Sequence, residues 1–315
     1  MAFEIYVDET NESPVIQLKD GSAGCNVEIY SFGALLNAFC ITTPGKKVNV
    51  IDGFLSPQDA KENITNGFKS AKLSPFVCRM EKGEYQLEGV THKIKKHYLG
   101  AEAIHGLLFD AAFTIKEYGT DGQCAFVKLN YVYAKKEEGF PFSFSVEILY
   151  KLSSNYSLDI TTSVTNTGEK EMPLSDGWHP YFKLGESVND LQMKINSNTM
   201  LEFDNRLLPS GNYINYNSYE TMQPLNDTFL DNSFLLKNHD VPACILKNTE
   251  AGLELTITAD PSYPYLQIYT PGHRKSIAVE NLSSAPDAFN NGIGLIKIKP
   301  GQSYNFKTTY RLSLV

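Results

Sequence analysis

The sequence predicts an all-β protein, a large antiparallel β-sandwich with few short helices. Apolar and polar residues alternate in several segments, as expected of strands with one buried face. Turn signals separate these segments, and only one segment carries clear helix signals. Antiparallel strands joined by hairpins, with almost no crossover helices, indicate packed sheets and argue against a parallel α/β fold. The alternating segments are residues 142–148, 158–164, 253–258 and 304–314.

Further strand and turn signals follow the same pattern. Residues 125–133 are more continuously apolar or aromatic, which predicts a strand covered on both sides. Turns are expected at Asp20-Gly21 and at residues 120–123, 166–168 and 249–252, each of which contains a glycine.

The helix signals begin at Ser56. Ser56 is a favourable N-cap, Pro57 suits the first helical position, and Asp59 places an acid in the first turn. The helix is expected to continue into residues 60–70 and to break or end around Gly67. No linker, charge block or repeat divides the chain, so residues 1–315 are expected to form a single domain.

Charge and hydropathy bear on the possible partners. The 315 residues include 28 Lys+Arg and 36 Asp+Glu, a formal net charge of −8. Nucleic-acid-binding and basic membrane-surface proteins need the opposite balance, at least locally. The longest basic run, Lys93-Ile94-Lys95-Lys96, is expected at a solvated strand end, and no apolar run approaches the ~18 residues of a membrane span. Neither nucleic acid nor a membrane is therefore expected as a partner.

The cysteines indicate a reducing compartment. They are dispersed, odd in number and without C-x-x-C spacing, so they are expected to be reduced thiols. The N-terminus shows no charged segment followed by an apolar one, as an export signal would require. A cytoplasmic location is expected. The five cysteines are Cys25, Cys40, Cys78, Cys124 and Cys244.

Several familiar catalytic motifs are absent from the sequence. It contains no G-x-G-x-x-G after a strand, no G-x-x-x-x-G-K-[ST], no H-E-x-x-H and no G-x-S-x-G. Phosphate-binding loops, zincin-type metal sites and hydrolase serines are therefore unsupported. Short polar islands remain at the ends of apolar runs, around Arg79, His105-Gly106, Trp178-His179, Asp231 and Glu280.

Three of these islands have a plain structural interpretation beside the functional one. Arg79 could donate two hydrogen bonds to vicinal hydroxyls, or form a surface salt bridge. His105, before Gly106 at the mouth of a strand, is a weak signal because single histidines are usually structural. Asp231 lies in a loop-like stretch with acids and amides, and such loops are usually only solvated.

The other two islands suit acid/base chemistry. His179 follows the only tryptophan, Trp178, and precedes two more aromatic residues. An imidazole among rings can transfer protons near neutral pH, although an aromatic core corner is an equal alternative. Glu280 ends a short apolar strand, where burial would raise its pKa and make it a useful base. A strand-end salt bridge is the alternative for Glu280.

In this order, the islands resemble the aldose 1-epimerase (galactose mutarotase) family, from about Gly21 to the C-terminus. The resemblance implies a galactose mutarotase-like supersandwich and an isomerase that interconverts the α and β anomers of a free aldohexose. It implies no cofactor and no metal, because ring opening of a hemiacetal needs only a base for the anomeric hydroxyl and an acid for the ring oxygen. A monosaccharide is the expected partner.

The resemblance also assigns roles to the residues. Glu280 falls on the family's catalytic glutamate and His179 on its second histidine, which makes them the base and the protonated acid. The remaining residues would bind the sugar: His105, Arg79 and Asp231 through the ring oxygen and hydroxyls, and Trp178 by stacking on the sugar face.

The sequence departs from the pattern of the well-known enzymes around these residues. Leu107 follows Gly106, where those enzymes tend to have a second glycine. Trp178 and Lys183 stand where they tend to have asparagine, and Asn281-Leu282 follows the glutamate in place of Pro-Gln. The acid and the base are kept while their neighbours differ, so the reaction type is better predicted than the sugar.

Three other functions compete with this interpretation. A hexose-phosphate 1-epimerase would need a cationic clamp, which Lys183, or Arg274 with Lys275, could supply. A non-catalytic carbohydrate-binding sandwich would use the same aromatic residues and amides without an acid/base pair. A metalloenzyme would use two histidines and one carboxylate as ligands, namely His105, His179 and Glu280.

Overall fold

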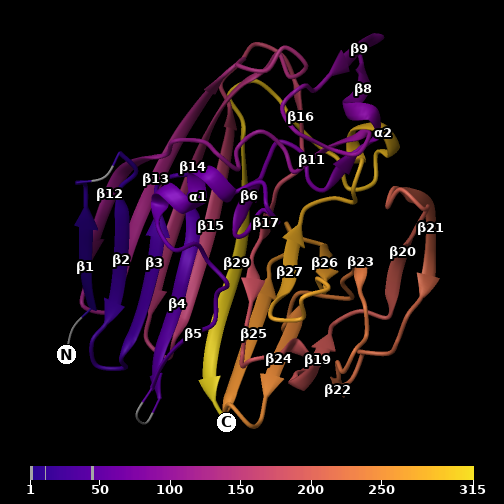
Figure 1. Ribbon diagram of the computed structural model, residues 1–315. Helices are drawn as coiled ribbons and strands as arrows, with labels where there is room; N and C mark the ends of the chain where they lie inside the picture. The colour runs from indigo at the N-terminus through magenta and orange to yellow at the C-terminus, as the bar shows by residue number, and fades with distance from the viewer. Residues whose placement is uncertain (1–2, 11, 44–45) are drawn as a thin grey trace.

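Antiparallel sheets make up most of the structure, a computed structural model that describes residues 3–10, 12–43 and 46–315 (Figure 1). Every strand pairing in the named sheets is antiparallel. The all-β prediction is confirmed. Two large sheets of nine and eight strands and a five-stranded sheet form the body, and shorter ladders complete it.

The five-stranded sheet is formed by the first strands of the chain. Its order is β1 (Phe3–Asp8), β2 (Val15–Asp20), β3 (Cys25–Tyr30), β4 (Leu35–Thr43) and β5 (Lys46–Asn49). The nine-stranded sheet has the order β12 (Thr114–Thr120), β13 (Cys124–Ala134), β14 (Ser143–Ser153), β15 (Ser157–Asn166), β29 (Ser303–Leu314), β25 (Leu253–Ala259), β24 (Cys244–Asn248), β19 (Gln192–Ile195) and β22 (Gln223–Pro224).

The eight-stranded sheet contributes most of the strands around the site described below. Its order is β21 (Pro209–Asn215), β20 (Thr199–Phe203), β23 (Asp231–Leu235), β26 (Tyr265–Tyr269), β27 (Ile277–Leu282), β17 (Gly177–His179) and β6 (Ala71–Leu73), with β18 (Tyr181–Phe182) also paired to β27. The short ladders are β10 (Tyr98–Leu99) with β11 (Glu102–Ile104) and β7 (Arg79–Met80), β16 (Met172–Leu174) with β28 (Ile296–Ile298), and β8 (Glu84–Leu87) with β9 (Val90–Lys93).

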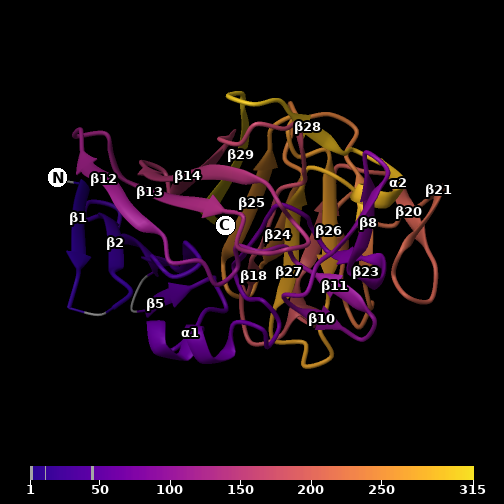
Figure 2. The same cartoon turned by 90° about the horizontal axis from the view of Figure 1, so that it is seen from above.

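One hydrophobic cluster joins the sheets. It contains Ile16 of β2, Ile148 of β14, Ile257 of β25 and Val279 of β27, all fully buried. Seen from above, the β1–β5 sheet lies at one end of the molecule and β20 and β21 at the other (Figure 2). The core therefore runs through the molecule from one end to the other.

The alternating sequence pattern is realised in the strands. Buried and partly exposed residues alternate along β14, β15 and β25, because one face of each strand packs on the core. The predicted turn segments connect β2 to β3, β12 to β13 and β24 to β25, and residues 166–168 begin where β15 ends. One prediction was wrong: β13 is not covered on both sides, since Val127 and Leu129 are buried while Lys128 and Asn130 stay partly exposed.

The predicted helix is present but shorter than expected. Helix α1 (Pro57–Asn63) begins at Ser56, whose hydroxyl accepts a hydrogen bond of 3.1 Å from the Asp59 amide. The regular helix ends before Gly67, and the chain continues in turns to Phe68, which has a left-handed backbone (φ 56°). The Phe68 ring is buried. The other helices are α2 (Ala288–Asn291) and the 3₁₀ helices Glu81–Gly83 and Val188–Asp190.

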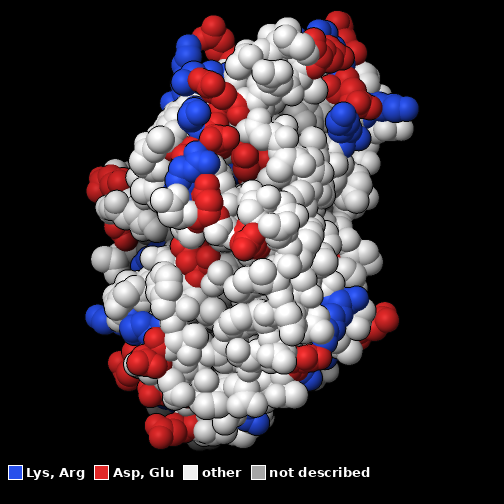
Figure 3. All heavy atoms as spheres, turned by 90° about the vertical axis from the view of Figure 1, so that its right-hand side faces the viewer, with Lys and Arg blue, Asp and Glu red and all other residues white. Residues whose placement is uncertain are grey.

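The cysteines and the surface charges bear on the compartment and partners expected from the sequence. All five cysteines are free, in agreement with the predicted reduced thiols, and all five are buried. On the face shown in Figure 3, acidic and basic side chains are interspersed, and much of the surface carries neither. No helix among the described residues is long and apolar enough to cross a membrane.

Candidate active site

The register of the eight-stranded sheet aligns polar side chains across neighbouring strands. Gln267 of β26 lies opposite Glu280 of β27, and Asp231 of β23 lies opposite Tyr269 of β26. Residues 267 and 269 are two positions apart and therefore point to the same face of the sheet. The same face receives His179 from β17, which pairs with β27. Residues far apart in the sequence are thus brought together on one surface.

Arg79 and His105 come from the three-stranded sheet beside this surface. Arg79 of β7 pairs with Ile104 of β11, and the amide of His105 donates to the Cys78 carbonyl at 2.9 Å. His105 and Gly106 both have positive φ, 63° and 76°, so the chain turns sharply here. A Cβ on Gly106 would lie 2.4 Å from the Ser74 carbonyl oxygen, which explains the glycine after the histidine.

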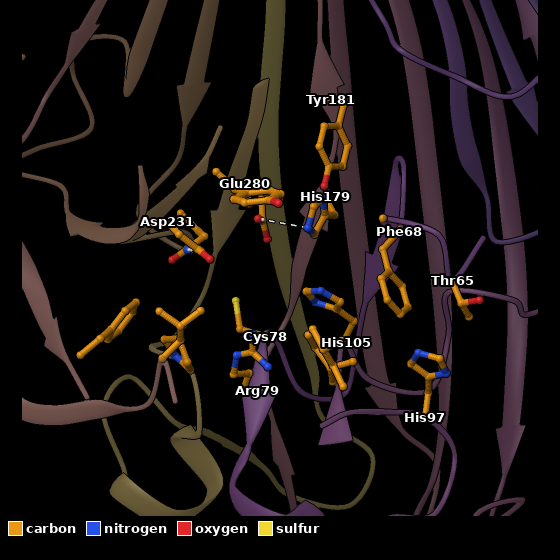
Figure 4. Close-up of a pocket in the computed structure, with 18 residues that line it drawn as sticks. Thr65, Phe68, Cys78, Arg79, His97, His105, His179, Tyr181, Asp231 and Glu280 are labelled. Carbon is orange, nitrogen blue, oxygen red and sulfur yellow. Dashed lines mark hydrogen bonds and ion pairs between the residues drawn. The ribbon is translucent and has the colours of Figure 1, made fainter. Parts of the chain in front are cut away.

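These side chains surround a cavity of about 280 Å³. This volume is close to the lower end of small-molecule sites, roughly 300–1,000 Å³. Glu280 and His179 lie on one side of it, Asp231 on a second, and Arg79 and His105 on a third (Figure 4). The wall is completed by Thr65, Gly67, Phe68, Cys78, His97, Leu99, Ile104, Tyr181, Phe203, Leu207, Gln267, Tyr269 and Pro286.

Glu280 and His179 form a buried pair. The distance between His179 Nε2 and Glu280 Oε1 is 3.3 Å, and the residues are only 5% and 2% exposed. The remaining polar atoms of the pair, His179 Nδ1 and Glu280 Oε2, have no hydrogen-bond partner among the described residues. Buried polar atoms are rarely left unpaired, so these two atoms are available to a ligand.

Burial decides the protonation of this pair. It raises the pKa of Glu280 well above its usual value, with a smaller contribution from the negative charge of Asp231. It also lowers the pKa of His179 to about 4. Both shifts disfavour the charged forms. The uncharged forms of both side chains are therefore favoured in this pair.

His105 lies at right angles to the catalytic candidate His179. Their ring centroids are 5.0 Å apart, and the Phe68 ring meets the His105 ring edge-on with centroids 4.6 Å apart. Burial lowers the pKa of His105 well below its usual value, and repulsion from a protonated His179 and from Arg79 would act in the same direction. His105 is therefore neutral, and its Nδ1 atom has no partner among the described residues.

Asp231 accepts a hydrogen bond from Gln267, a residue that no sequence motif singles out. Gln267 Nε2 donates to Asp231 Oδ1 at 2.9 Å. Burial raises the pKa of Asp231, while the Arg79 charge and the Gln267 hydrogen bond oppose this shift. Among the described residues, no carboxylate lies within 4 Å of the Arg79 guanidinium. Its donors are therefore free for hydroxyl groups, and the surface salt bridge considered for Arg79 is not formed.

The expected role of Trp178 does not fit its position. Trp178 neighbours His179 on β17, and successive residues of a strand point to opposite faces. Its ring is 3% exposed, packs near Tyr150 and lies 4.4 Å from Lys72 Nζ. Trp178 does not line the cavity, so it is a core residue and not a stacking surface for a ligand.

Aromatic residues other than Trp178 line the cavity, among them the tyrosines Tyr181 and Tyr269. Tyr181 stacks on His179 with ring centroids 4.9 Å apart, and Tyr269 lies next to Asp231 across the β23–β26 ladder. Tyr181 could have been selected from the sequence, because it is two residues from His179 and therefore on the same face of an extended chain. Tyr269 and Gln267 carry no local motif, and only the strand register reveals them.

The cationic clamp that a hexose phosphate would need is not formed at this cavity. Lys183 and Lys275 line a separate depression of about 680 Å³ together with Lys69. Arg274 donates to the carbonyl of Thr228 and to the side chain of Asn189, so it stabilises loops. Among the described residues that line the cavity, Arg79 is the only lysine or arginine.

A metal site is not supported by the donor geometry either. The metal interpretation requires His105, His179 and Glu280 to converge on one point. Within the described part of the chain, no group of three His, Cys, Asp or Glu side chains has a geometry that could hold a metal ion.

Known proteins resemble this chain over nearly its whole length. Residues 14–311 match the family described as aldose 1-epimerase. An aldose 1-epimerase of Streptococcus thermophilus is 24% identical over 329 aligned residues, which cover 93% of this chain and 92% of that protein.

Solved structures share the same fold. A galactose mutarotase-like protein of Clostridium acetobutylicum superimposes with a TM-score of 0.88 at 22% identity, covering 100% of this chain and 99% of the other. A galactose 1-epimerase of Lactobacillus acidophilus gives a TM-score of 0.83 at 18% identity, covering 99% and 98%. The predicted mutarotase-like sandwich is thereby confirmed.

Proposed function

Because the chain belongs to the aldose 1-epimerase family, we propose that it interconverts the α and β anomers of a free aldohexose, with Glu280 as base and His179 as acid. The family makes the protein an isomerase that acts on carbohydrates. The buried thiols are consistent with a cytoplasmic location.

The reaction needs two proton transfers at the anomeric centre, one from the anomeric hydroxyl and one to the ring oxygen. Glu280 takes the proton from the anomeric hydroxyl, the bond between C1 and the ring oxygen breaks, and His179 gives its proton to that oxygen. The open-chain aldehyde rotates about its C1–C2 bond, and the reverse transfers close the ring on the other face. No electron leaves or enters, and the pair recovers its proton in each cycle.

The observation that carries this proposal is the buried Glu280–His179 pair with its two unpartnered atoms. Burial favours the uncharged form of the pair. A sugar hydroxyl that donates to Glu280 Oε2 stabilises the carboxylate, because hydrogen bonds to a charged form favour it. Substrate binding thereby shifts the shared proton towards His179, which is the state that ring opening requires. Each of the two groups can contribute roughly 10²–10⁴-fold to the rate.

The other polar residues of the cavity suit a neutral sugar. Asp231 and Arg79 offer an acceptor and a fork of donors for hydroxyl groups, and His105 lies within the same wall. A hexose phosphate would have to share the single guanidinium of Arg79, which favours a free sugar as substrate. A sandwich that only binds carbohydrate does not need an acid/base pair. The Glu280–His179 pair therefore favours an enzyme over a binding protein.

Polarimetry tests the proposal directly. Freshly dissolved α-glucose and α-galactose should reach their anomeric equilibrium faster with the protein than without it, and their 6-phosphates should respond much less. Activity should persist in EDTA. Equal rates with and without protein for every sugar would refute the proposed activity, and loss of activity in EDTA would favour a metal-dependent reaction.

A further inference from the structure

Arg79 stands on a very short strand at the edge of a sheet. Strand β7 has two residues and lies at the end of the three-stranded sheet, beside β11. It follows Cys78, whose backbone is left-handed (φ 49°). Among the described residues, no carboxylate forms an ion pair with the Arg79 guanidinium. The place of this guanidinium therefore depends on how the backbone of β7 is held.

Asp287 bonds to the free edge of β7. The Asp287 amide donates to the Arg79 carbonyl at 2.8 Å, and Asp287 Oδ1 accepts from the Glu81 amide at 3.0 Å. Both backbone groups point away from β11, because the Cys78 carbonyl between β7 and β11 accepts from His105 and successive residues of a strand bond to opposite sides. Asp287 thus pairs with β7 as a neighbouring strand would, with a side-chain oxygen in the place of a backbone carbonyl.

The left-handed backbone of Asp287 (φ 58°) explains this arrangement. It directs the Asp287 carbonyl into α2, where the carbonyl accepts hydrogen bonds from the amides of Asn290 and Asn291 at 2.9 and 3.0 Å. Aspartate is one of the few residues that adopt this conformation readily. Asp287 is buried, and Asn290 Nδ2 donates to the same Oδ1 at 2.7 Å. The orientation of the carboxylate is therefore fixed.

Helix α2 anchors Asp287 to the core. The helix lies beside β8 (Figures 1 and 2) and also contacts β7. Its Phe289 ring is buried and meets the Tyr85 ring of β8 edge-on, with centroids 5.0 Å apart. Pro286, the residue before Asp287, lines the cavity together with Arg79. Asp287 therefore connects a packed part of the molecule to the strand that presents Arg79.

We propose that Asp287 is a positioning residue for substrate binding, which holds the backbone of Arg79 so that the guanidinium meets the hydroxyl groups of the sugar. This inference rests on the proposed function. Arg79 is expected to bind the ground state and the transition state equally, so the loss of its positioning raises KM and Kd and changes kcat much less. Glu280 and His179 lie on strands of the eight-stranded sheet and keep their places.

Asp287→Gly tests the proposal, because glycine keeps the left-handed backbone and the amide but removes the carboxylate. Polarimetry should give a KM for galactose and glucose about fivefold to tenfold higher, at a kcat near that of wild type. NMR titration with the same sugars should show the same rise in Kd. Asp287→Asn keeps an acceptor oxygen and should recover most of the affinity. The control is Asp121→Gly, which removes another aspartate that accepts two backbone amides, in the turn between β12 and β13, and should change neither constant.

A double variant separates positioning from a general structural role. In the Arg79→Ala background, Asp287→Gly should raise KM no further, because the group that Asp287 positions is absent. Effects of the two changes that multiply would overturn the proposal. Wild-type KM and Kd in folded Asp287→Gly would overturn it as well.

Glu81→Pro gives the same test if Asp287→Gly does not fold. It keeps Asp287 and removes the amide that donates to it, and the extended backbone of Met80 suits a residue before proline. KM and Kd should rise in Glu81→Pro and stay unchanged in the control Arg206→Ala, which removes only the ion pair of the Glu81 side chain. If the wild-type protein accelerates no anomerisation, the proposed function fails, and the Kd values still decide the role of Asp287. A wild-type protein that binds neither sugar would overturn both.

Discussion

Glu280 is the single residue whose replacement should cost the most activity. In Glu280→Gln the shape of the side chain is kept and its basicity is removed. The value of kcat should therefore fall by about 100-fold or more. Polarimetry of α-glucose measures this directly. Glu4→Gln on β1 is the control, because Glu4 is an exposed glutamate of another sheet. Wild-type turnover in folded Glu280→Gln would reject Glu280 as the base.

The same variant makes a second prediction, about stability. Burial raises the pKa of Glu280, so its contribution to stability is complete only below the unfolded-state pKa of about 4.3. This contribution is lost as the pH rises towards the folded-state pKa. Glutamine has no charge to bury. The free energy of unfolding of Glu280→Gln, relative to wild type, should therefore rise as the pH increases above about 4.3. A constant difference across this range would contradict the assigned pKa direction.

Arg79 and Asp231 should act on binding more than on chemistry. If they hold hydroxyls that stay in place as the ring opens, they interact equally with the ground state and the transition state. Loss of such uniform binding appears mainly in KM. In Arg79→Ala or Asp231→Ala, KM should rise by roughly one to two orders of magnitude, and kcat should fall less than in Glu280→Gln. If Asp231→Ala abolished kcat at unchanged KM, Asp231 would be an acid/base group.

The pH dependence of the rate follows from the shared proton. Activity requires the Glu280–His179 pair to hold one proton. Below the His179 pKa of about 4, a second proton binds and no base remains. Above the raised pKa of Glu280, the pair loses its only proton and no acid remains. A plot of kcat/KM against pH should therefore be bell-shaped. A rate that rises steadily with pH after buffer correction would show that the pair does not act as acid and base.

At the scale of secondary-structure elements, a buried ion pair joins β6 to the segment that leads into β17. Lys72 is fully buried, forms an ion pair with Asp176 and donates to the Gly177 carbonyl at 3.2 Å. Tyr263 also donates to Asp176, at 2.7 Å. Lys72 lies opposite Trp178, one residue before His179, so the pair holds the strand that presents the catalytic histidine.

Removal of one partner should destabilise the fold strongly. Asp176→Asn leaves the Lys72 ammonium buried without a counter-charge, which typically costs about 3–5 kcal/mol. Thermal unfolding monitored by circular dichroism measures the loss. The double change Lys72→Met with Asp176→Leu should recover much of it, because both charges are then absent. For the exposed pair Lys116–Glu147, the change Glu147→Gln should cost about 0–1 kcal/mol. Equal losses at both pairs would contradict the argument.

At the scale of the whole molecule, the sequence predicted the fold through its local patterns. Alternation identified the strands of the core, and glycine-containing turns identified their ends. The site residues Arg79, His105, His179, Asp231 and Glu280 could be named because each stands in a short motif, and the cavity brings all five together. Their catalytic and binding roles stay predictions.

The sequence did not predict the placement of side chains that depends on the order and register of the strands. Gln267 reaches Asp231 only because β26 lies between β23 and β27, and no local pattern encodes that order. Trp178 was misplaced because a motif shows which residues are neighbours in the chain, whereas strand alternation sends neighbours to opposite faces. Helix α1 was extended too far because its regular hydrogen bonding ends at Asn63 and residues 64–67 form turns, a boundary that no local motif marks.

The hydrophobic core is continuous from β2 to β29. We therefore predict that residues 1–315 unfold as one domain. Leu18 of β2 and Leu312 of β29 belong to the same cluster, and the Tyr150 hydroxyl of β14 donates to the Ala34 carbonyl beside β4 at 2.7 Å. Trp178 reports on the eight-stranded sheet by fluorescence, whereas circular dichroism reports on every sheet. If the molecule unfolds cooperatively, the two thermal midpoints should coincide, and the calorimetric and van't Hoff enthalpies should agree. A separate circular-dichroism transition without a fluorescence change would mean that β1–β5 unfold as an independent unit.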